Sequence, residues 1–197
     1  MTAPHSPAPA TLAHHLEHIA RQVQAADQQL PPMFRPPADN ATIVRAEARL
    51  GRTLPASLRT LYGIADGQTE GSATLLDAFS WMPLDEVLDR SEFLNDFFPD
   101  GRNEEDPDHA PMDVAPGIKP SWWWPHWLPI MANGAGDYLC LDLDPAPGGH
   151  SGQVIAYYHD ETYRLLIAPS IEHLIEVIAN GLSSGTYALV DGMIVEV

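Results

Sequence analysis

The chain has 197 residues, of which 45% are hydrophobic and 19% are charged, a composition typical of one globular domain and not of a disordered or fibrous chain. Ten basic residues against 27 acidic ones give a formal net charge of −17, which argues against nucleic acids and membranes as partners. The single cysteine, Cys140, excludes an intrachain disulfide framework and a cysteine-rich zinc site, and it favours a reducing compartment.

The amino terminus is rich in proline, alanine, serine and threonine over residues 1–11, which predicts a flexible tail. It has neither the basic start nor the apolar stretch of a secretory signal. No segment approaches the roughly 18 consecutive apolar residues of a membrane-spanning helix. We therefore expect a cytoplasmic protein with a single domain over residues 12–197.

Three helices are expected in the first third of the chain. Apolar residues recur at steps of three and four over residues 12–30, which predicts an amphipathic helix that two prolines end. Asn40 is the expected N-cap of a second helix, and Gly51 suits the left-handed residue after its end. A third helix is expected to begin at Leu54-Pro55 and to end at Asp66-Gly67, because proline is tolerated at the first helical position.

The next part of the chain is strongly acidic. A strand is expected over residues 74–81, followed by the start of a helix. We interpret residues 85–116 as an acidic insertion, a long surface loop with a partial helix. Eleven carboxylates and two arginines lie between Asp85 and Asp113, so this segment alone contributes −9 to the net charge. The acidic field is therefore local and not a diffuse background.

Strands dominate the second half of the chain. Apolar and polar residues alternate over residues 138–144, and two further strands are expected at 153–159 and 163–168. Within the first of these strands, Asp142 and Asp144 are expected on a face that contacts water. The residues expected on the sheet face that a final helix covers are Leu139, Leu141, Leu143, Val154 and Tyr157, with Leu174, Ile175 and Ile178 from that helix.

The chain is expected to close with a helix and a hairpin. Ser170 is the predicted N-cap of the final helix, and Gly181 is its predicted end. Asp191-Gly192 predicts a hairpin with a type I′ turn. Helices first, then a meander of strands, then a helix indicate an α+β fold, with a mainly antiparallel sheet on which the C-terminal helix packs.

Potential metal ligands occur in three places, but none completes a coordination pattern. His14 and His18 are spaced for one helix face, yet no third ligand is fixed near them. The acidic segment does not fit an EF-hand loop, because Phe98 and Pro107 fall where oxygen ligands are required. Turn capping is the better interpretation of a third set, which comprises Asp137, Asp142, Asp144, His150, His159 and Asp160. We therefore expect no catalytic residue, no metal and no cofactor, with a metal-dependent hydrolase as the most distant alternative.

Tryptophan is concentrated in one short segment. Four of the five tryptophans lie within six residues, as Trp122, Trp123, Trp124 and Trp127. Consecutive side chains point in different directions, so we expect at least one member of the run 122–124 at a surface, where tryptophan often anchors protein contacts. Packing inside the domain is the alternative for each of them.

Short motifs follow one another in a fixed order over about residues 40–182. In the first part they are Ala46-Glu47, Leu50-Gly51, Leu54-Pro55, Leu61-Tyr62 and Asp66-Gly67. In the second part they occupy residues 127–130, 134–142, 152–155, 158–160 and 168–174. In this order and spacing the chain resembles the SUKH superfamily, the Smi/Knr-type group that includes the yeast cell-wall assembly regulator and many bacterial immunity proteins. The resemblance implies a mainly antiparallel sheet with helices packed against it, and a function without catalysis.

The resemblance implies two functions. The first is an immunity protein that binds and neutralises a cognate polymorphic toxin, and the acidic surface favours a basic toxin domain such as a nuclease. The residues expected to contact this partner are Trp122, Trp123, Trp124, Glu104, Glu105, Asp106 and Asp108. The alternative is a regulatory scaffold of the cell-wall assembly regulator type, for which a long disordered flank would be expected.

Overall fold

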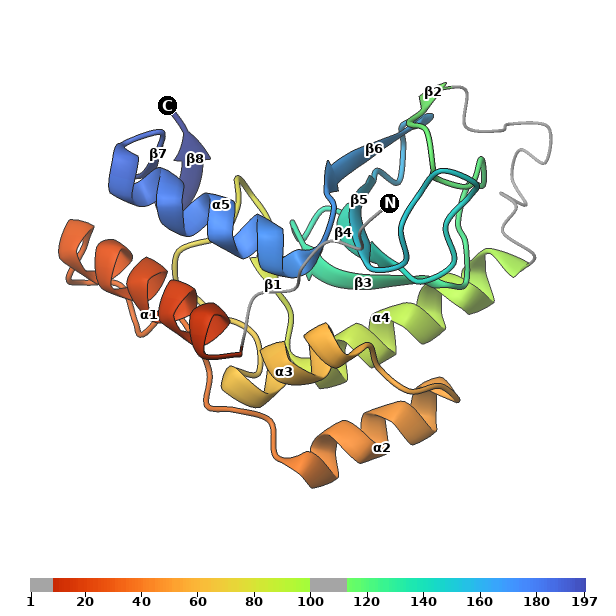
Figure 1. The fold of residues 1–197 in the computed structure, drawn as a ribbon, viewed down its shortest axis with the longest axis horizontal. Coiled ribbons are helices and arrows are strands. Elements are labelled where there is room, and N and C mark those ends of the chain that lie inside the picture. The colour runs from red at the N-terminus through yellow and green to blue at the C-terminus, as the bar shows by residue number, and fades with distance from the viewer. Residues whose placement is uncertain (1–8, 100–112) are drawn as a thin grey trace.

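The computed structural model of this protein describes residues 9–99 and 113–197 (Figure 1). Its helices are α1 (Pro9–Ala26), α2 (Asn40–Leu50), α3 (Ala56–Ile64), α4 (Leu84–Phe97) and α5 (Ile171–Ser184). The strands of the main sheet are β1 (Ser80–Trp81), β2 (Asp113–Val114), β3 (Trp127–Ala132), β4 (Tyr138–Asp142), β5 (Gln153–Tyr157) and β6 (Tyr163–Ala168). A separate hairpin consists of β7 (Tyr187–Val190) and β8 (Met193–Glu196).

The main sheet has the strand order β1-β3-β4-β5-β6-β2. All neighbours pair antiparallel except β2 and β6, which are parallel. The predicted α+β fold with a mainly antiparallel sheet is thus confirmed. The predicted hairpin is also confirmed, because Asp191 and Gly192 both adopt positive φ values, 50° and 79°, as a type I′ turn requires.

Capping side chains set the helix ends near the predicted positions. The N-cap of α2 is Asp39, one residue before the predicted Asn40, and its carboxylate accepts a backbone N–H of the first turn at 2.7 Å. Gly51 ends this helix with a φ of 64°, in the left-handed region, as predicted. Ser170 is the N-cap of α5, also as predicted, and its hydroxyl accepts a backbone N–H at 3.2 Å.

The predicted end of the final helix is wrong. Helix α5 continues past Gly181 to Ser184, and the left-handed residue that follows it is Gly185, with a φ of 82°. Gly181 instead allows a close approach, because a Cβ at this position would overlap the ring of Tyr187 in β7. The glycine therefore seats the terminal hairpin against α5.

The region before α4 also differs from the prediction. Of the strand predicted over residues 74–81, only Ser80–Trp81 pairs with the sheet. Asp77 has a φ of 48°, and the backbone N–H of Phe79 donates to the carbonyl of Leu76 at 2.8 Å, so the chain makes a tight turn here. The first part of the predicted acidic loop is the regular helix α4, whose buried residues at helical spacing are Leu84, Val87, Leu88, Ser91 and Leu94.

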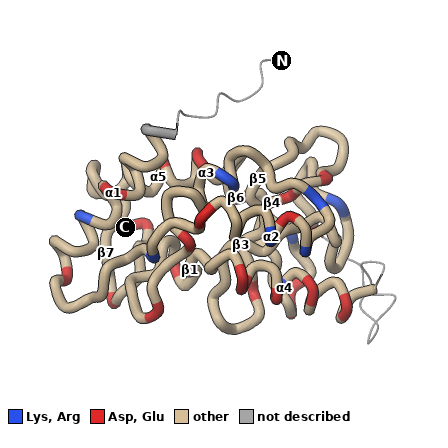
Figure 2. The backbone as a smooth tube through the Cα atoms, turned by 90° about the horizontal axis from the view of Figure 1, so that it is seen from below, with Lys and Arg blue, Asp and Glu red and all other residues tan. Residues whose placement is uncertain are grey.

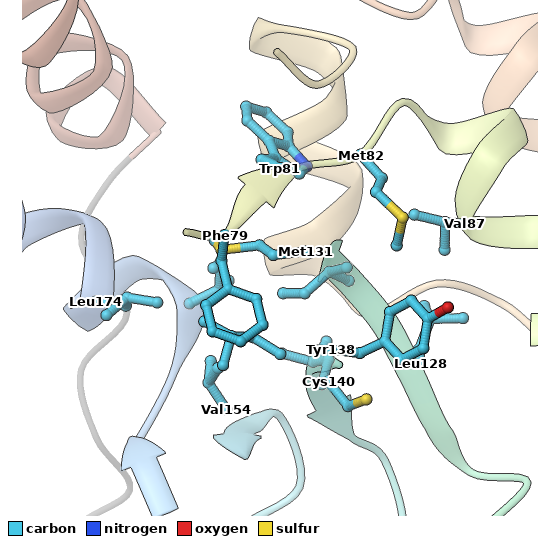
Figure 3. Packing of buried hydrophobic residues seen from close by; sticks show 14 of the residues in the cluster. Phe79, Trp81, Met82, Val87, Leu128, Met131, Tyr138, Cys140, Val154 and Leu174 are labelled. Carbon is cyan, nitrogen blue, oxygen red and sulfur yellow. The ribbon is translucent and has the colours of Figure 1, made fainter. Parts of the chain in front are cut away.

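The core lies on both faces of the central strands. Every residue of β4 and β5 is buried, so the expectation that Asp142 contacts water is wrong. Its carboxylate accepts a hydrogen bond from the side-chain amide of Gln153 at 2.9 Å. Tyr157 was expected beside Leu139, but it pairs directly with Tyr138 and so lies on the opposite face. On the face that carries Leu139 and Val154, Leu174 of α5 points toward Phe79 and Val154 (Figure 3).

The helices surround this sheet in two groups (Figure 1). Helix α1 lies along α5, where the Nε2 atom of His18 is 2.7 Å from the hydroxyl of Ser183. Helices α2, α3 and α4 lie together on the other side of the molecule, and α4 runs beneath β3. No helix in the described parts of the chain is long and apolar enough to cross a membrane.

Candidate functional site

The tryptophan run connects a loop to the core. Trp123 is fully buried, its Nε1 donates to the side-chain oxygen of Asn95 in α4 at 2.8 Å, and its ring lies edge-on to Trp127 at 5.9 Å. Trp122 is 6% exposed, and Trp124 is half-buried. Partner binding by these three residues stays a prediction. The acidic candidates Glu104, Glu105, Asp106 and Asp108 lie outside the described residues.

A groove opens where the end of α4 passes the sheet. Its volume is about 310 Å³, and we call it the aromatic groove. Helix α4 and the residue after it provide one wall, strands β4 and β5 provide the floor, and three loop residues complete it. The lining residues are Phe93, Leu94, Phe97, Phe98, Trp122, Gly136, Tyr138, Tyr157 and His159.

Local spacing explains the aromatic pairs of this groove. Phe93 and Phe97 are four residues apart on α4, so they are neighbours on one helix face, and their rings stack at 5.7 Å. Each of them is 53% exposed. Tyr138 and Tyr157 are directly opposite in the antiparallel pair of β4 and β5, and their rings stack at 6.1 Å.

A buried arginine supports the floor of the aromatic groove. Arg164 of β6 is fully buried, and its guanidinium lies 4.7 Å from the ring centre of Tyr157 and 5.2 Å from that of Trp122. It donates to the backbone carbonyls of Glu161, Tyr163 and Trp122 at 2.8–2.9 Å. No carboxylate forms an ion pair with it among the residues that the structure describes. The burial of this cation lowers the pKa of Arg164, and stacking on two rings and bonding to three carbonyls compensate part of its lost hydration.

At one end of the groove, a histidine bridges two loops. The Nδ1 atom of His159 lies 2.8 Å from Oδ1 of Asp137 and 3.7 Å from Oδ1 of Asp160. Hydrogen bonding to Asp137 raises the pKa of His159. Burial acts to raise the pKa of Asp137, but hydrogen bonds from His159 and Asn133 outweigh it and lower this pKa.

These three side chains are the described group whose geometry comes nearest to a metal site, since their ligand atoms lie within 4.8 Å of one another. The oxygens of Asp137 already accept three hydrogen bonds, two from His159 and one from Asn133. The arrangement therefore fits two loops held together by hydrogen bonds better than the ligand shell of a metal ion. Two other residues of the third set of potential ligands have different partners, as Asp142 accepts a hydrogen bond from Gln153 and Asp144 pairs with Lys119.

Helix α4 is predominantly acidic (Figure 2). It carries five carboxylates and a single cation, Arg90. Asp89 and Glu92 both pair with Arg49 of α2 at 2.6 Å, which ties the two helices together. Asp96 is exposed beside Phe97 and has no ion pair with any described residue.

Most of the chain matches a known protein family. Residues 37–177, most of the chain, match the model described as the SMI1 / KNR4 family (SUKH-1). The chain belongs to this family. The resemblance inferred from the sequence motifs is thereby confirmed.

Three curated relatives of this chain are fungal proteins named as regulators. A glucan synthesis regulatory protein of Neurospora crassa is 27% identical over 197 aligned positions, which cover 82% of this chain and 37% of the relative. The cell wall assembly regulator SMI1 of Saccharomyces cerevisiae is 23% identical, covering 79% of this chain and 37% of the relative. The cell wall biosynthesis/cell cycle regulator smi1 of Schizosaccharomyces pombe is 25% identical, covering 77% and 32%. The match thus spans about a third of each relative's length.

The motif glycines of this SUKH-1 chain serve its fold. Gly67 has a φ of 77°, and a Cβ there would lie 2.5 Å from the backbone nitrogen of Pro83. Gly136 has a φ of 109°, and a Cβ there would lie 3.1 Å from the ring of His159, at the end of the aromatic groove.

A second, polar cleft of about 550 Å³ lies beside residues 67–83, and its lining includes Arg35 and Glu86.

Phe93 and Phe97 were not among the residues predicted to contact a partner. A signal was present, because two phenylalanines four residues apart lie outside the buried stripe of a helix that is otherwise acidic on its surface. The remaining lining residues come from distant parts of the chain, so only the folded structure brings them together.

Proposed function

We propose that this chain is a non-enzymatic regulatory module that acts by binding other proteins, in the class of cell-wall assembly regulators. The family match over residues 37–177, together with relatives named as regulators of cell-wall assembly and glucan synthesis, carries this proposal. It corresponds to the alternative that the sequence left open. The relatives' names favour it over toxin neutralisation.

The aromatic groove supports protein binding over catalysis. Among the described residues its lining contains no carboxylate, serine, cysteine or lysine. Its polar groups are those of His159 and of the aromatic side chains, and apolar contact and stacking therefore dominate. Exposed aromatic side chains beside a small groove are typical of protein recognition sites. A helical wall on a floor of paired strands is also a rigid frame for such contacts.

An immunity function is the second candidate, and the charge of −17 favours it, because acidic surfaces speed the capture of basic toxin domains. Gene deletion in the source organism separates the two candidates. A regulator predicts an altered cell-wall polysaccharide composition that the reintroduced gene restores. An immunity protein predicts an unchanged wall and a loss of viability when the adjacent toxin gene is expressed. An unchanged wall with full viability would contradict both.

A further inference from the structure

The exposed pair Phe93 and Phe97 has no role in the core of this protein. The buried stripe of α4 lies on another side of the helix, and both rings keep 53% of their surface in solvent. Exposed aromatic side chains that border a groove mark interaction sites, whereas isolated apolar residues on a surface need no explanation. The stacking of the two rings at 5.7 Å presents them as one flat surface.

We propose that the aromatic groove binds a short segment of a partner protein, which inserts one bulky apolar side chain and carries a lysine or arginine next to it. This inference names the ligand of the proposed protein-binding function and rests on that function. The inserted side chain contacts Phe93 and Phe97 on one side and Tyr138 on the other.

The size of the groove selects a side chain over a larger ligand. A volume of about 310 Å³ is at the lower end of small-molecule sites, which run from roughly 300 to 1,000 Å³. It fits one or two large side chains. Binding energy at such sites is concentrated in a few buried anchor side chains, so one inserted side chain is enough to occupy a groove of this size.

The charges around the groove select the residue beside the anchor. Asp96 is exposed next to Phe97, and Asp160 is exposed next to His159 at the opposite end. Two arginines already lie against the rings of the groove: Arg90 is 5.9 and 6.0 Å from the ring centres of Phe93 and Tyr138, and the buried Arg164 is 4.7 Å from that of Tyr157. A basic residue of the partner can therefore pair with Asp96, which has no ion pair with any described residue.

The test is a selection from a phage-displayed library of random dodecapeptides on the purified full chain, with affinities of the enriched peptides measured by calorimetry. We expect enriched peptides to share a bulky apolar residue with a lysine or arginine within two positions. Phe97→Ser should weaken their binding at least about tenfold, as loss of an anchor contact does. Asp96→Lys should reverse the preference for basic residues, and raising salt from about 50 to about 500 mM should weaken binding.

Two exposed residues away from the groove provide matched controls. Val44→Ser on α2 removes a comparably exposed apolar side chain, and Asp85→Lys reverses a charge at the far end of α4. Both should bind as the wild type does. The proposal is overturned if no peptide is enriched, if binding survives Phe97→Ser, or if acidic peptides prevail. Sedimentation equilibrium adds a further outcome, because self-association that Phe97→Ser abolishes would make a second copy the occupant instead. Failure here, with an altered wall after gene deletion, would remove only the groove inference.

Discussion

Gly67 shows how a single residue holds the segment that leads into α4. Its φ of 77° is strained for any other residue, and a Cβ would lie 2.5 Å from the nitrogen of Pro83. Gly67→Ala should therefore cost about 1–3 kcal/mol or more in unfolding free energy. Gly71→Ala is the control, because Gly71 has a nearly equal φ of 76° but an open Cβ position, so it should cost less. Chemical denaturation of both variants measures the difference, and equal losses would refute the close-approach argument.

The His159–Asp137 bond should make stability depend on pH. The raised pKa of His159 means that its contribution is complete below about pH 6.5, its unfolded pKa, and is lost as the pH rises through the folded value. The lowered pKa of Asp137 means that its contribution is present above about pH 3.9 and is lost as the pH falls through the folded value.

His159→Gln should therefore destabilise the protein more at pH 6 than at pH 8. Thermal unfolding across this range measures the difference between wild type and variant. His14→Gln, on an exposed position of α1, is the control for loss of one histidine. A difference that does not change with pH would show that the bond carries no protonation linkage.

Strands β4 and β5 consist entirely of buried residues. Leu141 has no exposed surface, so Leu141→Ala should reduce the free energy of unfolding by about 2–5 kcal/mol, through lost apolar contact and the cavity left behind. Leu166→Ala in β6 is the matched control, because that side chain is 47% exposed and should cost under about 1 kcal/mol. Denaturant titration compares them, and similar losses would mean that β4 is not a core strand.

Elements with local signals could be predicted from the sequence. The cap at Ser170 and the turn at Asp191-Gly192 depend on neighbouring residues alone, and both are as predicted. The misplaced features depend on distant contacts. The glycine at position 181 is explained by the close approach of Tyr187 in the hairpin. The burial of Asp142 is explained by its hydrogen bond from Gln153 and by packing on both faces of the sheet. Alternation alone indicates one dry face and does not reveal a second.

For the whole molecule, the sequence predicted the fold class and the family but not the aromatic groove. Phe93 and Phe97 fall in a stretch whose charge favoured a surface loop, and charge does not report which residues a helix exposes. Tyr138, Tyr157 and Trp122 join them only through strand pairing and the loop that Trp123 holds. The lining residues of the groove therefore come together only in the folded chain.

The most direct test of a regulator that binds its partners through this groove is gene replacement with the double variant Phe93→Ser/Phe97→Ser, followed by measurement of cell-wall polysaccharide composition. Val44→Ser serves as the control, and immunoblotting confirms equal protein levels. We predict that the double variant, although folded and present at wild-type level, reproduces the altered wall of the deletion, whereas the control does not. A wild-type wall in cells that carry only the double variant would contradict the account.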